Sequence, residues 1–204
     1  MKLGILGGTF DPVHCGHLLI AEEAQSRMEL QRVLFCPAGQ PRLRTGEPEA
    51  SAHHRLEMVR WAVQSNPDFS VSAIEIGRKG PSYTIDTLET LRQQEGPGTD
   101  LYFIMGADTL EGFDQWKEPG RVLELCRLVV VKRPGYEDPE IESVIRTFPA
   151  AKGRVFRLQG PCSKLSARTV RQRVAMGLPI DGLVPQVVKA YIDEQCLYKG
   201  EEET

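Results

Sequence analysis

Short apolar runs alternate along the chain with longer segments in which apolar residues recur every three or four positions. The runs have the length of buried strands, whereas the longer segments have the period of helices that pack by one face. The runs lie at residues 3–6, 32–36, 69–76, 101–105, 128–131 and 155–158. This alternation predicts a Rossmann-like α/β fold, a doubly wound and mostly parallel sheet that binds ligands at the carboxyl ends of its strands.

Capping residues indicate where two of the helices begin. Ser51 can cap a helix that ends near Val63, and either Ser82 or Thr84 can cap the next one. Residues 141–147 and 184–197 predict two further helices. The apolar faces expected for the two capped helices are Leu56, Val59, Trp61 and Val63 in the first, and Ile85, Leu88 and Leu91 in the second.

The composition is that of an ordinary globular protein. Of 204 residues, 41% are hydrophobic and 26% charged, and we expect one domain, residues 1–204, with 160–204 as its C-terminal helical part. A net charge of −3 argues against a nucleic-acid surface but allows a basic pocket for a phosphorylated ligand. No export signal and no membrane-length apolar run is visible, so we expect no membrane partner. A homo-oligomer is compatible with the sequence.

The five cysteines are scattered and never form a C-x-x-C pair. This usage favours reduced thiols and a cytoplasmic location. Cys15 lies within a glycine-rich loop, where we do not expect it to act as a nucleophile.

That loop, GGTFDPVHCGH at residues 7–17, separates the first strand from the first helix. Glycines allow close backbone approach to a ligand, and His17 falls near the helix N-terminus, where free N–H groups and the helix dipole favour anions. The loop matches neither G-x-G-x-x-G nor G-x-x-x-x-G-K-[ST]. A metal site on His14 and His17 would need further ligands, and no later Cys or His has suitable spacing. The pattern predicts a phosphate site without a protein-held metal.

Residues 14–17, His-Cys-Gly-His, resemble the H-x-G-H signature of a nucleotidyltransferase superfamily. With two glycines before Thr9, the loop resembles the nicotinate-nucleotide adenylyltransferase family of bacteria. The resemblance implies transfer of AMP from ATP to nicotinate mononucleotide, giving nicotinate adenine dinucleotide and pyrophosphate, with Mg²⁺ accompanying ATP. The ATP contacts implied in this loop are Gly8, Thr9, Phe10, His14 and His17.

Two segments that follow predicted strands resemble substrate-binding motifs of the same family. In PAGQPRLRTGE, Arg44 stands in place of a family lysine and Leu43 in place of a histidine; a solvated loop is the alternative interpretation. Ser82-Tyr83-Thr84-x-Asp86-Thr87-Leu88 resembles the segment that binds the nicotinate carboxylate. A helix N-terminus suits a carboxylate better than a neutral amide, so Tyr83 and Thr84 are implied substrate contacts.

The segment MGADTL resembles another ligand-facing loop of the family. Gly106 and Asp108 are implied ATP contacts, and Asp108 is also expected to cap a short helix. Trp116 follows in a polar stretch, where it is either a stacking platform for a pyridine ring or a tryptophan at the edge of the core. Lys117 beside it is an implied substrate contact.

Two C-terminal segments resemble phosphate-binding motifs. Arg133, in an R-P-G sequence, is an implied ATP contact. LSARTVR, residues 165–171, resembles the second superfamily signature, I-S-S-T-x-I-R, at which a helix N-terminus binds triphosphate. Ser166 and Arg171 match it, whereas Arg168 stands where threonine is expected and can replace the hydroxyl by charge. A capped basic helix without ligand contact is the alternative.

The attacking phosphate oxygen is ionised at neutral pH, so the reaction needs no general base and no covalent enzyme intermediate. His14, His17 and Arg171 are the implied catalytic residues. Related transferases that act on phosphopantetheine or on a phosphorylated alcohol share H-x-G-H, but are not expected to carry the Ser82–Leu88 motif. An enzyme equally active on the nicotinamide form and a regulatory nucleotide-binding module without turnover are two further alternatives.

Overall fold

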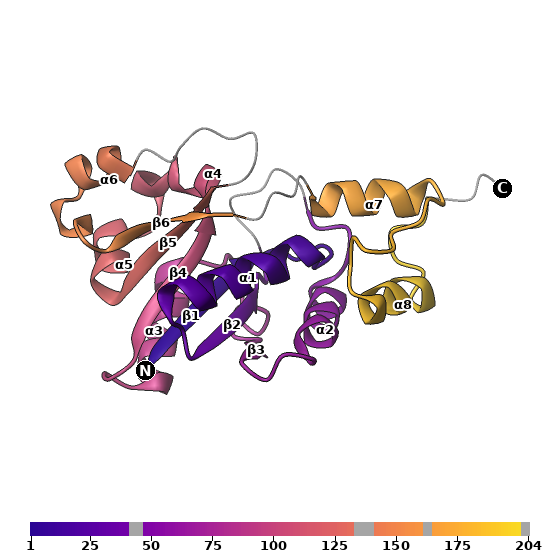
Figure 1. The fold of residues 1–204 in the computed structure, drawn as a ribbon, viewed down its shortest axis with the longest axis horizontal. Helices are drawn as coiled ribbons and strands as arrows, with labels where there is room; N and C mark the ends of the chain where they lie inside the picture. The colour runs from indigo at the N-terminus through magenta and orange to yellow at the C-terminus, as the bar shows by residue number, and fades with distance from the viewer. Residues whose placement is uncertain (41–46, 133–140, 161–164, 201–204) are drawn as a thin grey trace.

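A computed structural model of the chain describes residues 1–40, 47–132, 141–160 and 165–200. Its centre is a six-stranded sheet, parallel throughout, with the order β3-β2-β1-β4-β5-β6 (Figure 1). The strands are β1 (Lys2–Gly8), β2 (Arg32–Pro37), β3 (Phe69–Val71), β4 (Asp100–Gly106), β5 (Cys126–Lys132) and β6 (Val155–Gln159). The predicted doubly wound α/β fold is confirmed.

Eight α-helices and two short 3₁₀ turns occupy the described parts of the connections and the C-terminal region. The helices are α1 (Cys15–Met28), α2 (Ala52–Val63), α3 (Thr84–Glu95), α4 (Ala107–Leu110), α5 (Pro119–Leu125), α6 (Ile141–Thr147), α7 (Ala167–Ala175) and α8 (Gln186–Glu194). The 3₁₀ turns are η1 (Phe113–Gln115) and η2 (Pro149–Ala151). Figure 1 shows α7 and α8 together at the opposite end of the molecule from α5 and α6. None of the described helices combines the length and the apolar character that crossing a bilayer requires.

Alternation along the strands divides the core into two layers. Neighbouring strand residues point to opposite faces, so Leu3 and Ile5 of β1 pack with α3 and α5, whereas Leu6 packs with α1 and α2. Both faces of the sheet are therefore covered, which explains why the strands are apolar runs and not alternating ones. The layer of α1 and α2 also contains Val170 of α7 and Val188 of α8, and this joins the C-terminal helices to the sheet.

The strand order reverses beside β1. The chain passes from β1 outward to β2 and β3, then returns to place β4 on the other side of β1. The loops that follow β1 and β4 therefore diverge, and such a switch point forms a crevice at the carboxyl edge of a parallel sheet. Both glycine-containing motifs predicted to bind ligand begin at this crevice.

The third strand is shorter than the sequence pattern predicted. Residues 69–76 were expected in one strand, but β3 ends at Val71. The N–H group of Ser72 donates to the Phe35 carbonyl at 2.9 Å, and the next bond of this ladder would need an N–H group at Pro37, which proline lacks. The chain turns after this point, and the carboxylate of Glu75 becomes buried.

Several predictions about the helices are also wrong. Trp61 is 44% exposed, and the buried face of α2 uses Met58 and Ala62 beside Leu56, Val59 and Val63. The N-cap of α3 is Tyr83, which makes no side-chain cap bond. The Ser82 hydroxyl accepts from the Gly39 N–H instead, and Thr84 is the first residue of the helix. Asp108 lies inside the first turn of α4, whose N-cap is Gly106. The last helix begins only after Pro185, and α5 was not predicted.

Candidate active site

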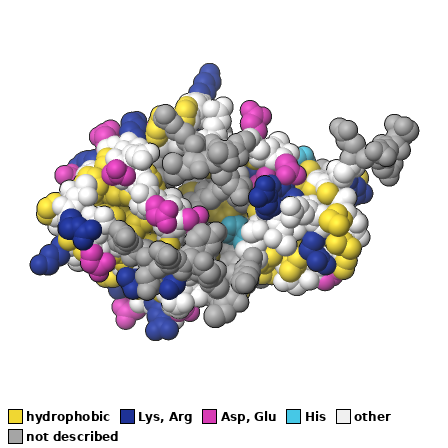
Figure 2. Space-filling view, turned by 90° about the horizontal axis from the view of Figure 1, so that it is seen from above, with side chains coloured by type: hydrophobic (Ala, Val, Ile, Leu, Met, Phe, Trp, Pro, Cys, Tyr) yellow, Lys and Arg dark blue, Asp and Glu magenta, His cyan; other side chains and the backbone are white. Residues whose placement is uncertain are grey.

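The loop between β1 and α1 holds its two histidines face to face. His14 is the N-cap of α1 and His17 occupies its third position, and their rings stack with centroids 3.7 Å apart. Gly16 makes this possible, since a Cβ there would lie 3.0 Å from Nδ1 of His14. His14 is 6% exposed and His17 is half-buried. Figure 2 looks onto this side of the molecule and shows histidine atoms at the surface near its middle.

A backbone hydrogen bond orients the His17 ring. The N–H group of His14 donates to Nδ1 of His17 at 3.2 Å. A neutral imidazole that accepts at Nδ1 carries its proton on Nε2, so this bond selects the tautomer with Nε2 as the donor. The edge of the Phe10 ring packs against His17 with centroids 5.0 Å apart. His17 is thus a preoriented donor at a helix N-terminus, where negative charge is favoured.

Asp11 ties this loop to two distant parts of the chain. Its carboxylate is 1% exposed and accepts from the N–H groups of Glu49 and Ala50, at 2.9 and 3.0 Å, and from the Tyr198 hydroxyl at 2.8 Å. Burial and the adjacent Asp11 charge raise the pKa of Tyr198, so its hydroxyl keeps its proton and donates. Residues 187 positions apart are joined by this bond, which the sequence did not predict.

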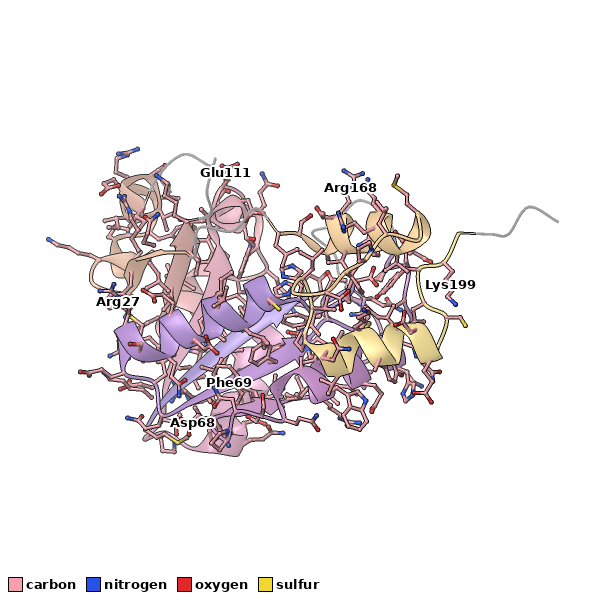
Figure 3. All side chains as sticks on the ribbon, turned by 45° about the vertical axis from the view of Figure 1, so that its right-hand side comes forward. Arg27, Asp68, Phe69, Glu111, Arg168 and Lys199 are labelled. Atoms are coloured by element: carbon pink, nitrogen blue, oxygen red, sulfur yellow. The ribbon has the colours of Figure 1, made fainter. Side chains whose placement is uncertain are left out.

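Helix α7 brings the second predicted phosphate motif to the same side. Ser166 is its N-cap, and the Ser166 hydroxyl oxygen accepts from the Thr169 N–H at 3.2 Å. Arg171 donates to Glu49 Oε1 at 2.5 Å and to the Asp11 carbonyl at 2.8 Å. Arg168 is exposed and lies on the same side of the molecule as Glu111, which follows α4 (Figure 3). The structure therefore brings Arg171 to the histidine loop, while Arg168 remains at the surface.

A buried arginine that sequence reasoning missed links three loop carbonyls. Arg55 is 1% exposed and donates to the carbonyls of Thr9, Gly39 and Ala50 at 2.7, 3.1 and 3.3 Å. Burial lowers the pKa of its guanidinium, and nearby Asp11 opposes that shift. A signal was available, because Arg55 precedes buried Met58 and Val59 by three and four positions and therefore lies on the buried face of α2.

The predicted carboxylate-binding motif has a partly structural role. Its Thr87 hydroxyl donates to Glu75 Oε1 at 2.8 Å, and Ser82 also hydrogen-bonds this buried carboxylate. Burial raises the pKa of Glu75, while these two hydroxyls and the charge of Arg78 act against the increase. Ser82 and Thr87 thus support a buried acid, which leaves Tyr83 and Thr84 at the start of α3 as the candidate ligand contacts.

Two predicted substrate contacts, Lys117 and Trp116, lie near the start of α3. Lys117 forms an ion pair with Asp86 at 2.7 Å, and its ammonium group lies 4.9 Å from the centre of the Tyr83 ring. Trp116 is half-buried and packs against Phe113 and Phe103, with ring centroids 5.2 and 6.0 Å apart. The tryptophan is therefore an edge-of-core residue by its packing. Its indole N–H has no hydrogen-bond partner within the described residues.

The remaining predicted ATP contacts differ in how accessible they are to a ligand. Phe10 is 2% exposed and so offers a ligand almost no surface, and the Thr9 carbonyl accepts from Arg55. Gly8 and Gly106 are the last residues of β1 and β4, on either side of the crevice. Arg44, Leu43 and Arg133 lie outside the described residues.

Comparison with known proteins relates this geometry to a family. A family model described as cytidylyltransferase-like matches residues 5–173. A probable nicotinate-nucleotide adenylyltransferase of Roseiflexus sp. (strain RS-1) is 47% identical over 198 residues, covering 97% of this chain and 98% of the relative. The corresponding Thermomicrobium roseum protein is 43% identical, covering 97% of this chain and 92% of its own length. The chain belongs to the nicotinate-nucleotide adenylyltransferase family.

The fold is shared with solved structures of low sequence identity. The nicotinic acid mononucleotide adenylyltransferase of Plasmodium falciparum complexed with NaAD is 18% identical, with a TM-score of 0.75 and 97% of each chain covered. The same protein complexed with APC gives a TM-score of 0.76 at 17% identity, with 97% of this chain and 96% of the other covered. Membership in the adenylyltransferase family makes the chain a nucleotidyltransferase of NAD biosynthesis, which transfers AMP from ATP to nicotinate mononucleotide.

Enzymes of this nucleotidyltransferase family use a divalent metal together with ATP. The part of the chain that the structure describes contains no group of three His, Cys, Asp or Glu side chains that could hold a metal ion. Burial raises the pKa of Cys15, and its thiol is therefore not activated as a nucleophile.

Proposed function

We propose that the crevice at the carboxyl edge of β1 and β4 aligns ATP and nicotinate mononucleotide so that AMP passes directly from one to the other. A phosphate oxygen of the mononucleotide attacks the α-phosphorus of ATP in line and forms the new anhydride bond. The bond between the α-phosphorus and the bridging oxygen breaks, and pyrophosphate leaves. The attacking oxygen is already ionised, so no protein base takes part and no covalent enzyme intermediate forms.

The observation that carries this proposal is the stacked pair of His14 and His17 at the start of α1. The His14 N–H group fixes His17 as an Nε2 donor, and a preorganised donor of this kind stabilises charge that develops on a transferring phosphate. Alignment of the two reactants can supply about 7–11 kcal/mol of the barrier reduction. We therefore assign His14 and His17 to the α-phosphate.

ATP is assigned to the side of the crevice formed by β1, β4 and α7. We propose that α7, with the rest of residues 160–204, completes the ATP site, and that Arg171 and Arg168 meet the triphosphate. Arg171 is already held beside the histidine loop by Glu49 and the Asp11 carbonyl. The assigned ATP contacts are Gly8, Thr9, Phe10, His14, His17, Gly106, Asp108, Arg133, Ser166, Arg168 and Arg171.

We propose Mg²⁺ as the divalent metal, entering as its complex with ATP. When bound, it neutralises negative charge on the phosphates. Asp108 is exposed in the first turn of α4, directly after β4. We assign its carboxylate to the ATP side of the crevice.

Nicotinate mononucleotide is assigned to the start of α3. The first N–H groups of a helix lack intrahelical partners and favour a carboxylate, which supports Thr84 as the nicotinate contact. Tyr83, Lys117 and Trp116 lie together around this helix start, and the indole N–H of Trp116 lacks a described partner. We also propose Arg44, which follows β2 in the sequence, as a phosphate contact.

The experiment that tests this function is the His17→Ala substitution in an assay of pyrophosphate release. With Mg-ATP and nicotinate mononucleotide, we expect kcat to fall by about 10²–10³, the usual cost of losing one preorganised donor. His53→Ala is the matched control, since His53 is exposed in the first turn of α2. A correctly folded His17→Ala enzyme with the kcat of the unsubstituted protein would exclude the proposed role.

A further inference from the structure

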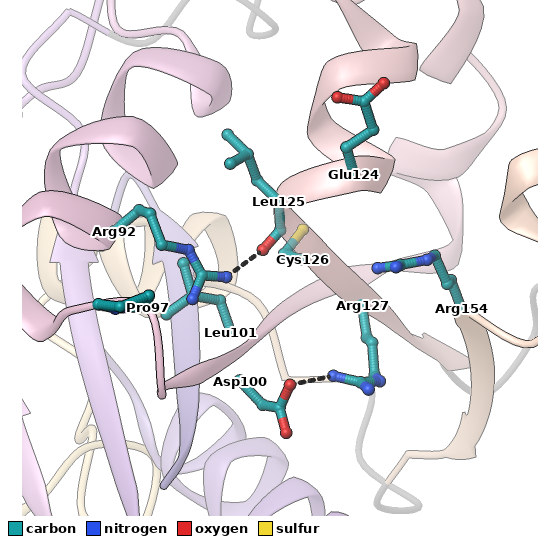
Figure 4. A pocket seen from close by; sticks show the side chains of 9 residues that line it. All are labelled: Arg92, Pro97, Asp100, Leu101, Glu124, Leu125, Cys126, Arg127 and Arg154. Atoms are coloured by element: carbon teal, nitrogen blue, oxygen red, sulfur yellow. Dashed lines mark hydrogen bonds and ion pairs between the residues drawn. The ribbon is translucent and has the colours of Figure 1, made fainter.

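A second pocket lies at the opposite edge of the sheet from the proposed active site. It has a volume of about 340 Å³ and is formed where β4, β5 and β6 begin (Figure 4). Leu101, Leu125 and Cys126 contribute apolar surface, and three arginines surround it: Arg92 from α3, Arg127 from β5 and Arg154 directly before β6. The volume lies at the lower end of the range for small-molecule sites, so it suits a compact ligand.

The acidic groups of this pocket already have cationic partners. Asp100 accepts from Arg127 at 2.7 Å, and Glu124 accepts from Arg121, on the same helix, at 2.7 Å. Each pair is close to neutral. The remaining two guanidiniums, those of Arg92 and Arg154, therefore give the pocket its net positive charge.

Neither of these two guanidiniums has a carboxylate partner within the described residues. Arg92 is half-buried and donates to the backbone carbonyls of Leu125, at 2.8 Å, and Thr99. These bonds fix its position, and its charge also acts on Asp100, which already pairs with Arg127. Arg154 is also half-buried, and its side chain forms no hydrogen bond or ion pair with the described residues. Figure 4 shows its guanidinium extending toward Cys126 from the β6 side.

Arg92 and Arg154 both line the pocket, and Figure 4 shows them on either side of Cys126. Burial raises the pKa of the Cys126 thiol to about 12, while Arg154 and Arg92 both act in the opposite direction. Two positive charges from different elements thus line the pocket on either side of Cys126. Two half-buried guanidiniums that hydrogen-bond no carboxylate are suited to a dianion, because hydrogen bonds from a guanidinium to an anion are charge-assisted.

We propose that this pocket binds a compact phosphate-bearing anion between Arg92 and Arg154. The site is separate from the crevice at the carboxyl ends of the strands, so it is not a subsite for ATP or the mononucleotide. Strands β4 and β5 connect the two edges, because they begin at the pocket and end at Gly106 and Lys132. A bound anion would therefore contact the same two strands that lead to the active-site loops.

NMR tests this proposal. The ¹⁵N-labelled chain is titrated with inorganic phosphate at constant ionic strength, and its amide shifts are measured at each step. We expect saturable shifts of the Leu101 and Cys126 amides in the unsubstituted protein. Arg154→Gln should weaken phosphate binding at these amides about tenfold or more, the equivalent of one charge-assisted hydrogen bond. Lys152→Gln is the charge-matched control, since Lys152 is exposed and does not line the pocket.

A second variant tests the proposal in the opposite direction. Glu124→Gln removes negative charge from the pocket rim and should tighten phosphate binding about two- to fivefold. Amides of Gly8 and Gly16 report phosphate at the active site and should respond alike in all these proteins. The proposal is overturned if Leu101 and Cys126 show no saturable shift, or if Arg154→Gln binds as tightly as the Lys152→Gln control. Because the readout is binding, the result does not depend on the proposed catalytic assignments.

Discussion

At the scale of single residues, the active-site side chains are held by one another before a ligand binds. Asp11 accepts three hydrogen bonds, Arg55 connects three carbonyls, and Arg171 is held by Glu49 and the Asp11 backbone. Preorganisation of this kind lowers the cost of alignment during the reaction. The H-x-G-H motif could be found from sequence because its residues are adjacent. The partners of Asp11 could not, because they come from distant segments that only the fold brings together.

Tyr198→Phe removes the hydroxyl that donates to buried Asp11. We expect a loss of about 1–3 kcal/mol in the free energy of unfolding, because a buried acceptor loses a partner. Urea denaturation measures this loss. Tyr191→Phe is the matched control: the Tyr191 hydroxyl contacts Nδ1 of His54 at 2.9 Å, and the Tyr191 side chain is only half-buried. A smaller loss for Tyr198→Phe than for the control would contradict the assigned role of the Asp11 bond.

Arg171→Ala removes the guanidinium assigned to triphosphate. We expect the KM for ATP to rise about tenfold or more, as for the loss of a charge-assisted hydrogen bond, with a smaller change in the KM for the mononucleotide. Steady-state kinetics at varied ATP measures the effect. Arg173→Ala is the control on the same helix, since Arg173 donates to the Pro179 carbonyl. Unchanged ATP kinetics for Arg171→Ala would remove Arg171 from the ATP site.

At the scale of elements, apolar runs and their spacing predicted most of the sheet. The run at 101–105 became β4 with one further residue at each end, since a fully buried strand gives a strong sequence signal. The end of β3 could not be predicted, because it depends on Pro37 in the neighbouring strand. The prediction of Ser82 as the cap of α3 was wrong for a similar reason. Its hydroxyl accepts a hydrogen bond from Gly39, which is distant in sequence.

Thr84→Pro tests whether the N-terminus of α3 binds the nicotinate carboxylate. Proline is tolerated at the first helical position, and the preceding Tyr83 has φ −115° and ψ 136°, which suit a residue before proline. The substitution removes one N–H donor and the hydroxyl while keeping the helix. We expect kcat/KM for nicotinate mononucleotide to fall about tenfold or more.

Thr84→Ala separates the two contributions, because it removes the hydroxyl and retains the N–H. If both variants keep the activity on nicotinate mononucleotide, the carboxylate site must lie elsewhere. If only Thr84→Pro loses activity, the backbone donor carries the recognition.

At the scale of the whole molecule, one buried acid links stability to pH. Burial raises the pKa of Glu75 above its usual value of 4.5, so the native state binds this proton more readily than the unfolded state does. Native stability contributed by the protonated form is therefore lost as pH rises from about 4.5 through the raised native pKa. The ionised carboxylate then remains buried, with Thr87 and Ser82 as hydrogen-bond donors.

Glu75→Gln removes this titration. We expect the free energy of unfolding of the variant, relative to the unsubstituted protein, to increase between pH 4 and pH 8, as measured by urea denaturation. Glu22→Gln is a control for the change of one charge at an exposed position of α1. A difference that stays constant over this pH range would contradict the proposed effect of burial.

As a member of its family, this molecule transfers AMP from ATP to nicotinate mononucleotide. The most direct test is pyrophosphate release from Mg-ATP, with nicotinate mononucleotide, nicotinamide mononucleotide and phosphopantetheine compared as acceptors. We predict the highest kcat/KM for the nicotinate form, because its carboxylate can meet the start of α3, and a site built around one hydrogen-bonding group can discriminate strongly. A preference for phosphopantetheine, or release with neither pyridine nucleotide, would contradict the substrate assignment.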